Sequence, residues 1–95
     1  MLYIRADGTE RHVEGRLTLE SLQFLVGGHA QHVVLPDGRH LFCDEDGKMK
    51  QRPLNQKASE LFYPKWDHVV GDVLVLTPEE YADMNNVRPF PGPRA

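Results

Sequence analysis

The sequence of 95 residues has a single cysteine, no long apolar run and no excess of positive charge. One cysteine, Cys43, cannot form an internal disulfide and excludes a cysteine-rich zinc site. No apolar run reaches the ~18 residues of a membrane helix, and the first residues lack the apolar segment of a signal peptide. The 11 Lys and Arg residues stand against 14 Asp and Glu, a net charge of −3, whereas domains that bind nucleic acid are usually basic. We therefore expect a cytoplasmic protein with no membrane contact and no general nucleic-acid binding.

The sequence also lacks the motifs that organise catalysis. It contains no GxGxxG or GxxxxGK[ST] phosphate loop and no HExxH metal motif. Ser21 and Ser59 fall within predicted helices and not in a nucleophile elbow, and Cys43 lies in an apolar strand, where a thiol is normally inert. A two-residue turn at Asp37-Gly38 would place His32 opposite Cys43, but two ligands do not complete a metal site. We expect no enzymatic activity, no bound metal and no cofactor.

What the sequence does contain is typical of one small globular domain, with 40% hydrophobic and 26% charged residues. Several short stretches are rich in strand-forming residues, and Asp-Gly dipeptides mark turns between them. The predicted strands cover residues 2–5, 11–14, 29–35, 39–44, 48–52 and 69–76. Because tight turns dominate, we predict an α+β fold whose antiparallel sheet has about five strands, including two hairpins.

Two main helices are indicated by their caps. Thr18 is a typical N-cap and Gly27-Gly28 a typical C-cap for a helix over residues 19–26. Asn55 is a typical N-cap for a second helix, which runs to Phe62 or Tyr63 before a proline ends it. We expect both helices on one face of the sheet.

The end of the chain divides into a short helix and a tail. Thr77-Pro78-Glu79-Glu80 forms a capping box that begins a helix through about Met84. Residues 87–95 contain three prolines and predict an extended arm. Phe90 would dock this arm into a groove on its own or a neighbouring subunit; alternatively the arm is a frayed terminus without a role. We therefore expect a single domain over residues 1–86 and a proline-rich tail over 87–95.

The segment before Asn55 suggests an anion site. In a strand, Lys48, Lys50 and Arg52 would project from one face, because side chains two positions apart share a face. This basic row leads to the N-terminus of the Asn55 helix, where unpaired N–H groups favour a phosphate. The alternative is an edge strand protected by outward lysines, with Asn55 merely a cap.

Two further groups of residues are candidates for binding. Tyr63 and Trp66 either stack on a base or contact a partner when exposed, or close the edge of the core when buried. The Asp44-Glu45-Asp46 run is either a solvated turn or part of an acidic surface that could imitate nucleic acid. Its spacing lacks the further ligands of a calcium loop.

Five short motifs together resemble a small domain-of-unknown-function family, number three-eight-four-six, over roughly residues 17–76. The motifs are Val26-Gly27-Gly28, Leu35-Pro36-Asp37-Gly38, Asp44-Glu45-Asp46-Gly47-Lys48, Pro53-Leu54-Asn55 with Ala58, and Val70-Gly71-Asp72. Because members of that family occur largely in bacteriophages and phage-derived regions, the resemblance implies a phage accessory protein in the bacterial host cytosol. The family has no established reaction, so the resemblance does not identify a target.

We expect a non-catalytic counter-defence protein that binds and sequesters a phosphate-bearing nucleotide, with a site at the interface of a homo-oligomer. The residues expected to contact this ligand are Gly47, Lys48, Lys50, Arg52, Asn55, Tyr63 and Trp66. The alternative is an inhibitor of a host defence nuclease or effector that binds its target protein through an acidic surface. The residues expected to contact that protein are Asp44, Glu45, Asp46 and Phe90.

Overall fold

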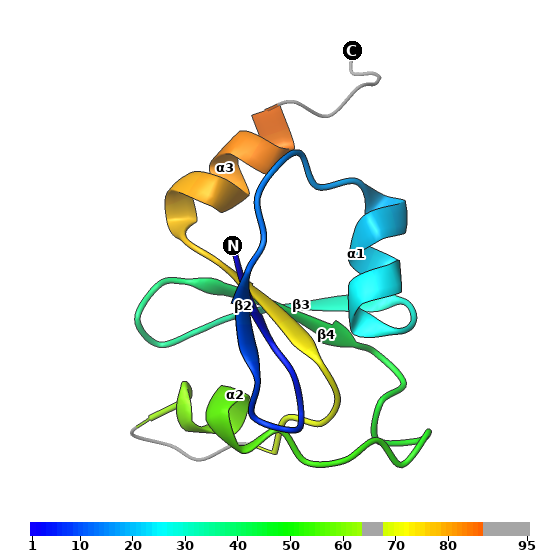
Figure 1. Ribbon diagram of the computed structural model, residues 1–95. Helices are drawn as coiled ribbons and strands as arrows, with labels where there is room; N and C mark the ends of the chain where they lie inside the picture. Colours follow the sequence, from blue (N-terminus) through cyan, green and yellow to red (C-terminus); the bar gives the residue numbers. More distant parts are fainter. Residues whose placement is uncertain (64–67, 87–95) are drawn as a thin grey trace.

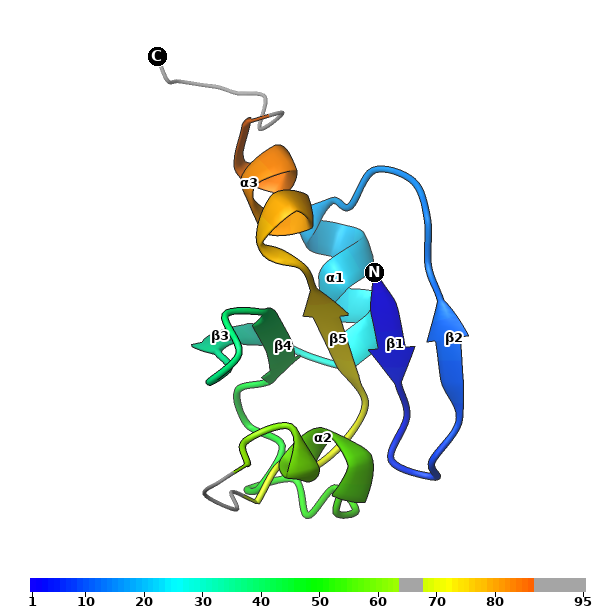
Figure 2. The same ribbon diagram turned by 90° about the vertical axis from the view of Figure 1, so that its left-hand side faces the viewer.

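The computed structural model describes residues 1–63 and 68–86 as an antiparallel sheet with three helices, which confirms the predicted α+β fold (Figure 1). In chain order the elements are β1 (Leu2–Ile4), β2 (Glu10–His12), α1 (Leu19–Val26), β3 (Ala30–Val34), β4 (His40–Asp44), α2 (Gln56–Glu60), β5 (Val73–Leu76) and α3 (Pro78–Asn86). In both ribbon views α2 lies at the bottom of the molecule, away from α1 and α3 (Figures 1 and 2).

The strands are hydrogen-bonded in the order β2-β1-β5-β4-β3, and each neighbouring pair is antiparallel. The last strand in the sequence, β5, is therefore the centre of the sheet, and the β1–β2 and β3–β4 hairpins flank it. All four residues of β5 are buried. The outer strands are β2, whose three residues are exposed, and β3.

Successive residues of β5 contribute to two separate hydrophobic cores. Val73 and Val75 pack with Ala58 of α2, whereas Leu74 and Leu76 pack with residues of α1 and, at the margin, of α3. Helices therefore cover both faces of the sheet. The expectation that the two main helices share one face was wrong, because an uninterrupted apolar strand has to be covered on both sides.

Three of the predicted elements differ from the observed ones. Residues 48–52 form turns and not a strand, since the backbone N–H of Arg52 returns to the carbonyl of Gly47 at 3.0 Å. The second helix is shorter than predicted, because α2 ends at Glu60. The last strand is also shorter, because Gly71 adopts a positive φ of 78° just before β5.

The register of the β3–β4 hairpin also differs from the prediction by one residue. Leu35 N–H donates to Arg39 O at 2.8 Å, so three residues and not two form the loop. As a result His32 lies opposite Phe42, and Gln31 lies opposite Cys43. The predicted facing pair of His32 and Cys43 was therefore wrong, because one shifted residue moves a side chain to the other face.

Candidate functional site

Two of the cations predicted to bind phosphate are paired with one buried carboxylate. The side chain of Asp44 is 0% exposed, and its Oδ2 lies 3.0 Å from Lys50 Nζ and 2.8 Å from Arg52 Nε. Asp44 Oδ1 accepts a hydrogen bond from the backbone N–H of Asp46. Burial raises the pKa of Asp44, but Lys50, the Asp46 N–H and Arg52 outweigh it and hold this pKa below its usual value. We call Asp44, Lys50 and Arg52 the ion cluster.

The ion cluster also binds the end of α1. The carbonyl of Gly27, the C-cap residue, accepts from Arg52 Nη2 at 2.8 Å and from Lys50 Nζ at 3.3 Å. Cations are favoured there because the last carbonyls of a helix carry partial negative charge and lack intrahelical partners. The cluster thus joins the loop after β4 to both β4 and α1.

Three glycines lie so close to the ion cluster that a side chain on any of them would have to displace side chains of the cluster. A Cβ on Gly28 would lie 2.7 Å from both Asp44 Oδ1 and Lys50 Nζ, and one on Gly71 would lie 2.8 Å from Arg52 Cδ. Gly27 has a positive φ of 86°, and its Cβ would meet Arg52 Nη2 at 2.7 Å. The glycine motifs that are far apart in the sequence therefore meet around one group of charges.

Asn55 is fully buried and binds the surrounding backbone. Its Nδ2 donates to the carbonyls of Ile4 and Gly71, both at 2.9 Å, and its Oδ1 accepts from the N–H of Ala58 at 3.0 Å. Asn55 is thus the N-cap of α2, as predicted, and it also links α2 to β1 and to the turn before β5. Both polar atoms of its side chain, Oδ1 and Nδ2, are engaged in these hydrogen bonds.

Two further predicted residues line a cavity of about 190 Å³ next to the loop after β4. Lys48 and Glu45 are exposed and line this cavity together with Phe62 of the turn after α2. Gly47 is buried, and its N–H donates to Asp44 O. Tyr63 is 82% exposed.

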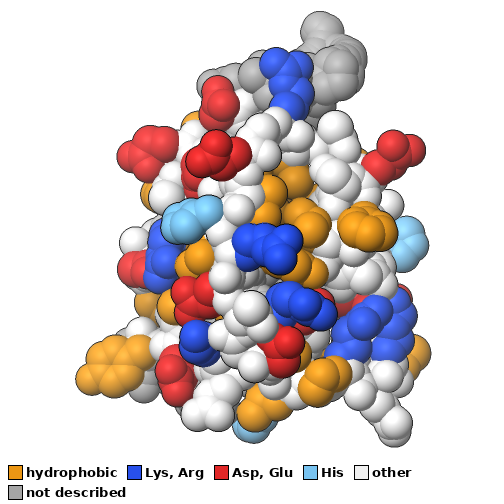
Figure 3. All heavy atoms as spheres, in the orientation of Figure 1, with side chains coloured by type: hydrophobic (Ala, Val, Ile, Leu, Met, Phe, Trp, Pro, Cys, Tyr) orange, Lys and Arg blue, Asp and Glu red, His pale blue; other side chains and the backbone are white. Residues whose placement is uncertain are grey.

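The structure brings only part of the predicted site together. Asp46 is half-buried and donates its N–H to Asp44, so the acidic run does not form a continuous exposed surface. Figure 3 shows Lys and Arg side chains interspersed with Asp and Glu side chains on the face that it draws. Trp66 and Phe90, and with Phe90 the whole predicted tail, lie outside the described residues.

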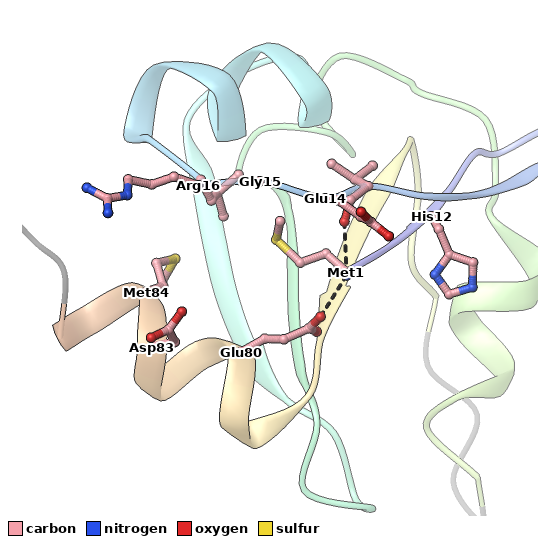
Figure 4. Close-up of a pocket in the computed structure, with 10 residues that line it drawn as sticks. Met1, His12, Glu14, Gly15, Arg16, Glu80, Asp83 and Met84 are labelled. Carbon is pink, nitrogen blue, oxygen red and sulfur yellow. Dashed lines mark hydrogen bonds and ion pairs between the residues drawn. The ribbon is translucent and has the colours of Figure 1, made fainter.

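A larger cavity, which the sequence did not indicate, lies between α3 and the segment that connects β2 to α1. It has a volume of about 560 Å³ and is open to solvent. The ten residues that line it are Met1, His12, Val13, Glu14, Gly15, Arg16, Leu17, Glu80, Asp83 and Met84. Met1 and Met84 extend into the space between α3 and the connecting segment (Figure 4). We call this cavity the α3 cleft.

The charged residues of the α3 cleft are mainly acidic. Glu80 Oε2 lies 2.8 Å from the N-terminal ammonium of Met1, and this contact and the Thr77 N–H lower the pKa of Glu80. Glu14 and Asp83 are exposed carboxylates, and the exposed Arg16 adds one positive charge to the lining. The capping box at Thr77 correctly predicted α3, but no local pattern predicts that residues 13–17 pass beside it.

Within residues 1–63 and 68–86, no group of three or more His, Cys, Asp or Glu side chains is placed to hold a metal ion. The helices in this described part of the chain are too short or too polar to cross a membrane.

Comparison with known proteins identifies a family but no characterised relative. No curated protein and no solved structure matches the chain. A family model described as a domain of unknown function, DUF3846, matches residues 1–89, a wider range than the motifs had indicated. The chain therefore belongs to the DUF3846 family.

Proposed function

We propose that this chain is a non-catalytic counter-defence protein that captures a basic segment of a host protein in the α3 cleft. From the sequence, a protein-binding inhibitor is the alternative to nucleotide binding. The proposal keeps that kind of partner but assigns the contact to the α3 cleft instead of Asp44-Glu45-Asp46. A volume of about 560 Å³ is within the range of roughly 300–1,000 Å³ that is typical of ligand sites.

The composition of the cleft wall carries this proposal. Met1, Val13, Leu17 and Met84 provide an apolar lining, and methionine side chains adapt readily to partners of different shape. Glu14 and Asp83 add exposed carboxylates at the same cleft. An apolar anchor next to a Lys or Arg side chain matches this combination of methionines and carboxylates.

NMR titration with a synthetic peptide that alternates Leu with Arg tests the proposal. We expect the backbone signals of residues 13–17 and α3 to shift, and the affinity to fall at least roughly tenfold in Asp83→Lys and Glu14→Lys, since reversed charges repel the peptide. Glu45→Lys is the matched control, because Glu45 is an exposed carboxylate outside the α3 cleft. Equal loss of affinity in all three variants, or shifts confined to other surfaces, would contradict the proposal.

Nucleotide sequestration is the second candidate function, and Lys48 supports it. This lysine is exposed and lines the smaller cavity, and Tyr63, which follows Phe62 of the same lining, is 82% exposed. About 190 Å³ accommodates a phosphate group but not a whole nucleotide, so the base would stack on Tyr63 outside the cavity.

Calorimetry with linear and cyclic nucleotides tests this second function separately. We expect Lys48→Glu to abolish the heat of binding, whereas Lys57→Glu, an exposed lysine on α2, leaves it unchanged. If the folded protein binds no nucleotide of the panel, nucleotide sequestration is excluded and peptide capture is unaffected.

A further inference from the structure

His32 of β3 and His40 of β4 form a hydrogen-bonded pair of imidazoles. His32 Nε2 and His40 Nδ1 are 2.8 Å apart. The ring centroids are 5.0 Å apart, and the ring planes differ by only 20°. His32 lies opposite Phe42 and His40 lies opposite Val34, so the two rings are diagonal neighbours across the hairpin, on the face that bears α1 and α3.

Tyr81 of α3 stacks on both imidazoles of this pair. Its ring centroid lies 3.9 Å from that of His40, with planes 8° apart, and 4.8 Å from that of His32, with planes 14° apart. Tyr81 also packs at the margin of the core formed by α1 and β5. The imidazole pair is therefore one of the surfaces against which α3 packs, beside the core contacts of Met84 and the ion pair of Glu80.

The distance between the two nitrogens limits how many protons the pair can hold. A contact of 2.8 Å needs one N–H donor and one lone pair, so one of the two facing nitrogens must be unprotonated. A first additional proton is compatible with this bond, because an imidazolium donates to a neutral imidazole and is attracted by the Tyr81 ring. A second one places two N–H groups and two positive charges face to face.

We propose that His32 and His40 form a pH-sensitive switch, in which protonation of both rings breaks their hydrogen bond and releases Tyr81 and α3 from the sheet. The proposal rests on the geometry of these three rings and not on the proposed capture of a partner. If both are correct, acid widens or dissolves the α3 cleft, because α3 is one of its walls.

The rings that stack on the pair carry no charge. Among the described residues, the neighbours from β4 and α3 that contact it are the uncharged rings of Phe42 and Tyr81. The acidic residues of the elements packed on this face are Glu20 of α1, Asp44 of β4, and Glu79, Glu80 and Asp83 of α3. Asp44 is paired with Lys50 and Arg52, and Glu80 with the N-terminal ammonium.

The direction of the pH effect follows from the pKa of His32. Burial, and secondly the charge of His40, hold the pKa of His32 below its ordinary value of 6.5. The unfolded chain therefore takes up this proton at a higher pH than the folded chain does. Stability is thus lost as the pH falls below about 6.5.

Amide hydrogen exchange at neutral pH and at about pH 5, corrected for intrinsic rates, tests the switch. We expect the protection of α3 to fall roughly tenfold relative to that of β5. In His32→Gln this relative loss should disappear, since an amide keeps a polar contact but cannot take up a proton. His29→Gln, an exposed histidine before β3 and outside the α3 cleft, is the matched control and should behave as the parent protein does.

A second measurement uses the unaltered protein. ¹⁵N NMR of the imidazoles reports when both rings are protonated, and the Tyr81 ring signals report whether the stack persists. Loss of the Tyr81 ring-current shifts together with the second protonation supports the switch. A Tyr81 ring that stays stacked beside two protonated imidazoles, or an unchanged α3 response in His32→Gln, would overturn it.

Discussion

At the scale of residues, the ion cluster shows how a binding motif and a structural motif can share one sequence. Lys50 and Arg52 were predicted to face a ligand, but they face Asp44 and the Gly27 carbonyl. The strand spacing that would group them with Lys48 does not occur, because residues 48–52 form turns. The sequence does not indicate the Gly27 carbonyl as a partner, because Gly27 precedes Lys50 by 23 residues and reaches it only in the folded chain. Long-range contacts of this kind have no local signal.

We expect Asp44→Asn to reduce the free energy of unfolding by about 2 kcal/mol, because it leaves Lys50 and Arg52 without a counter-charge. This is less than the loss for a fully buried pair, since the two cations are 43% and 32% exposed. Urea unfolding at neutral pH measures the change. Glu45→Gln changes an exposed neighbouring carboxylate and should alter the free energy of unfolding by less than about 0.5 kcal/mol. Equal effects of the two substitutions would show that the ion cluster does not stabilise the fold.

Gly71→Ala tests whether the glycines are needed for the space around Arg52. The new Cβ would lie 2.8 Å from Arg52 Cδ at a φ of 78°. Gly8→Ala is the matched control, because Gly8 has a similar φ of 93° and no atom within 4 Å of a built Cβ. The strain of placing alanine at a positive φ is therefore common to both variants. We expect the free energy of unfolding of Gly71→Ala to be lower than that of Gly8→Ala by about 1–2 kcal/mol, because the new Cβ crowds Arg52. Thermal unfolding of the two variants should separate them; identical midpoints would argue against a crowded site.

At the scale of elements, caps and turns predicted the structure better than side-chain alternation did. Thr18 is the N-cap and Gly27 the C-cap of α1, as predicted, and α3 begins at the Thr77 capping box. The alternating pattern of residues 48–52 was misleading, because short charged runs alternate equally well in turns. The β5 sequence Val-Leu-Val-Leu indicates a strand that is covered on both faces. The prediction that both main helices lie on one face did not take this pattern into account.

Asn55→Ala should destabilise the chain by about 3 kcal/mol, because it removes the α2 cap and two buried hydrogen bonds, those to the carbonyls of Ile4 and Gly71. Thr18→Ala removes an exposed N-cap of α1 and should cost only about 1 kcal/mol. Chemical denaturation of both variants compares the buried cap with the exposed one. A loss for Asn55→Ala no larger than that for Thr18→Ala would mean that its contacts to β1 and the β5 turn contribute little.

At the scale of the whole molecule, one central strand holds together two cores that would otherwise be independent. Leu74 and Leu76 connect β5 to α1, whereas Val73 and Val75 connect it to α2. The ion cluster and Asn55 then tie the loops at one end of the sheet to both layers. The α3 cleft lies away from these ties, between α3 and residues 13–17, so a binding surface can be altered there without loss of the fold.

The stability of the whole molecule should therefore decline in two separate steps as the pH falls. The first step begins below about pH 6.5, where His32 in the unfolded chain takes up a proton more readily than in the folded one. The second begins below about pH 4.5, because Asp37, Asp44 and Glu80 have pKa values lowered by their hydrogen bonds and charged partners in the folded state. Urea unfolding across this pH range measures both steps. His32→Gln should remove the first step and keep the second, whereas Asp44→Asn should weaken the second and keep the first. If either substitution changes both steps alike, the two groups of residues do not titrate independently.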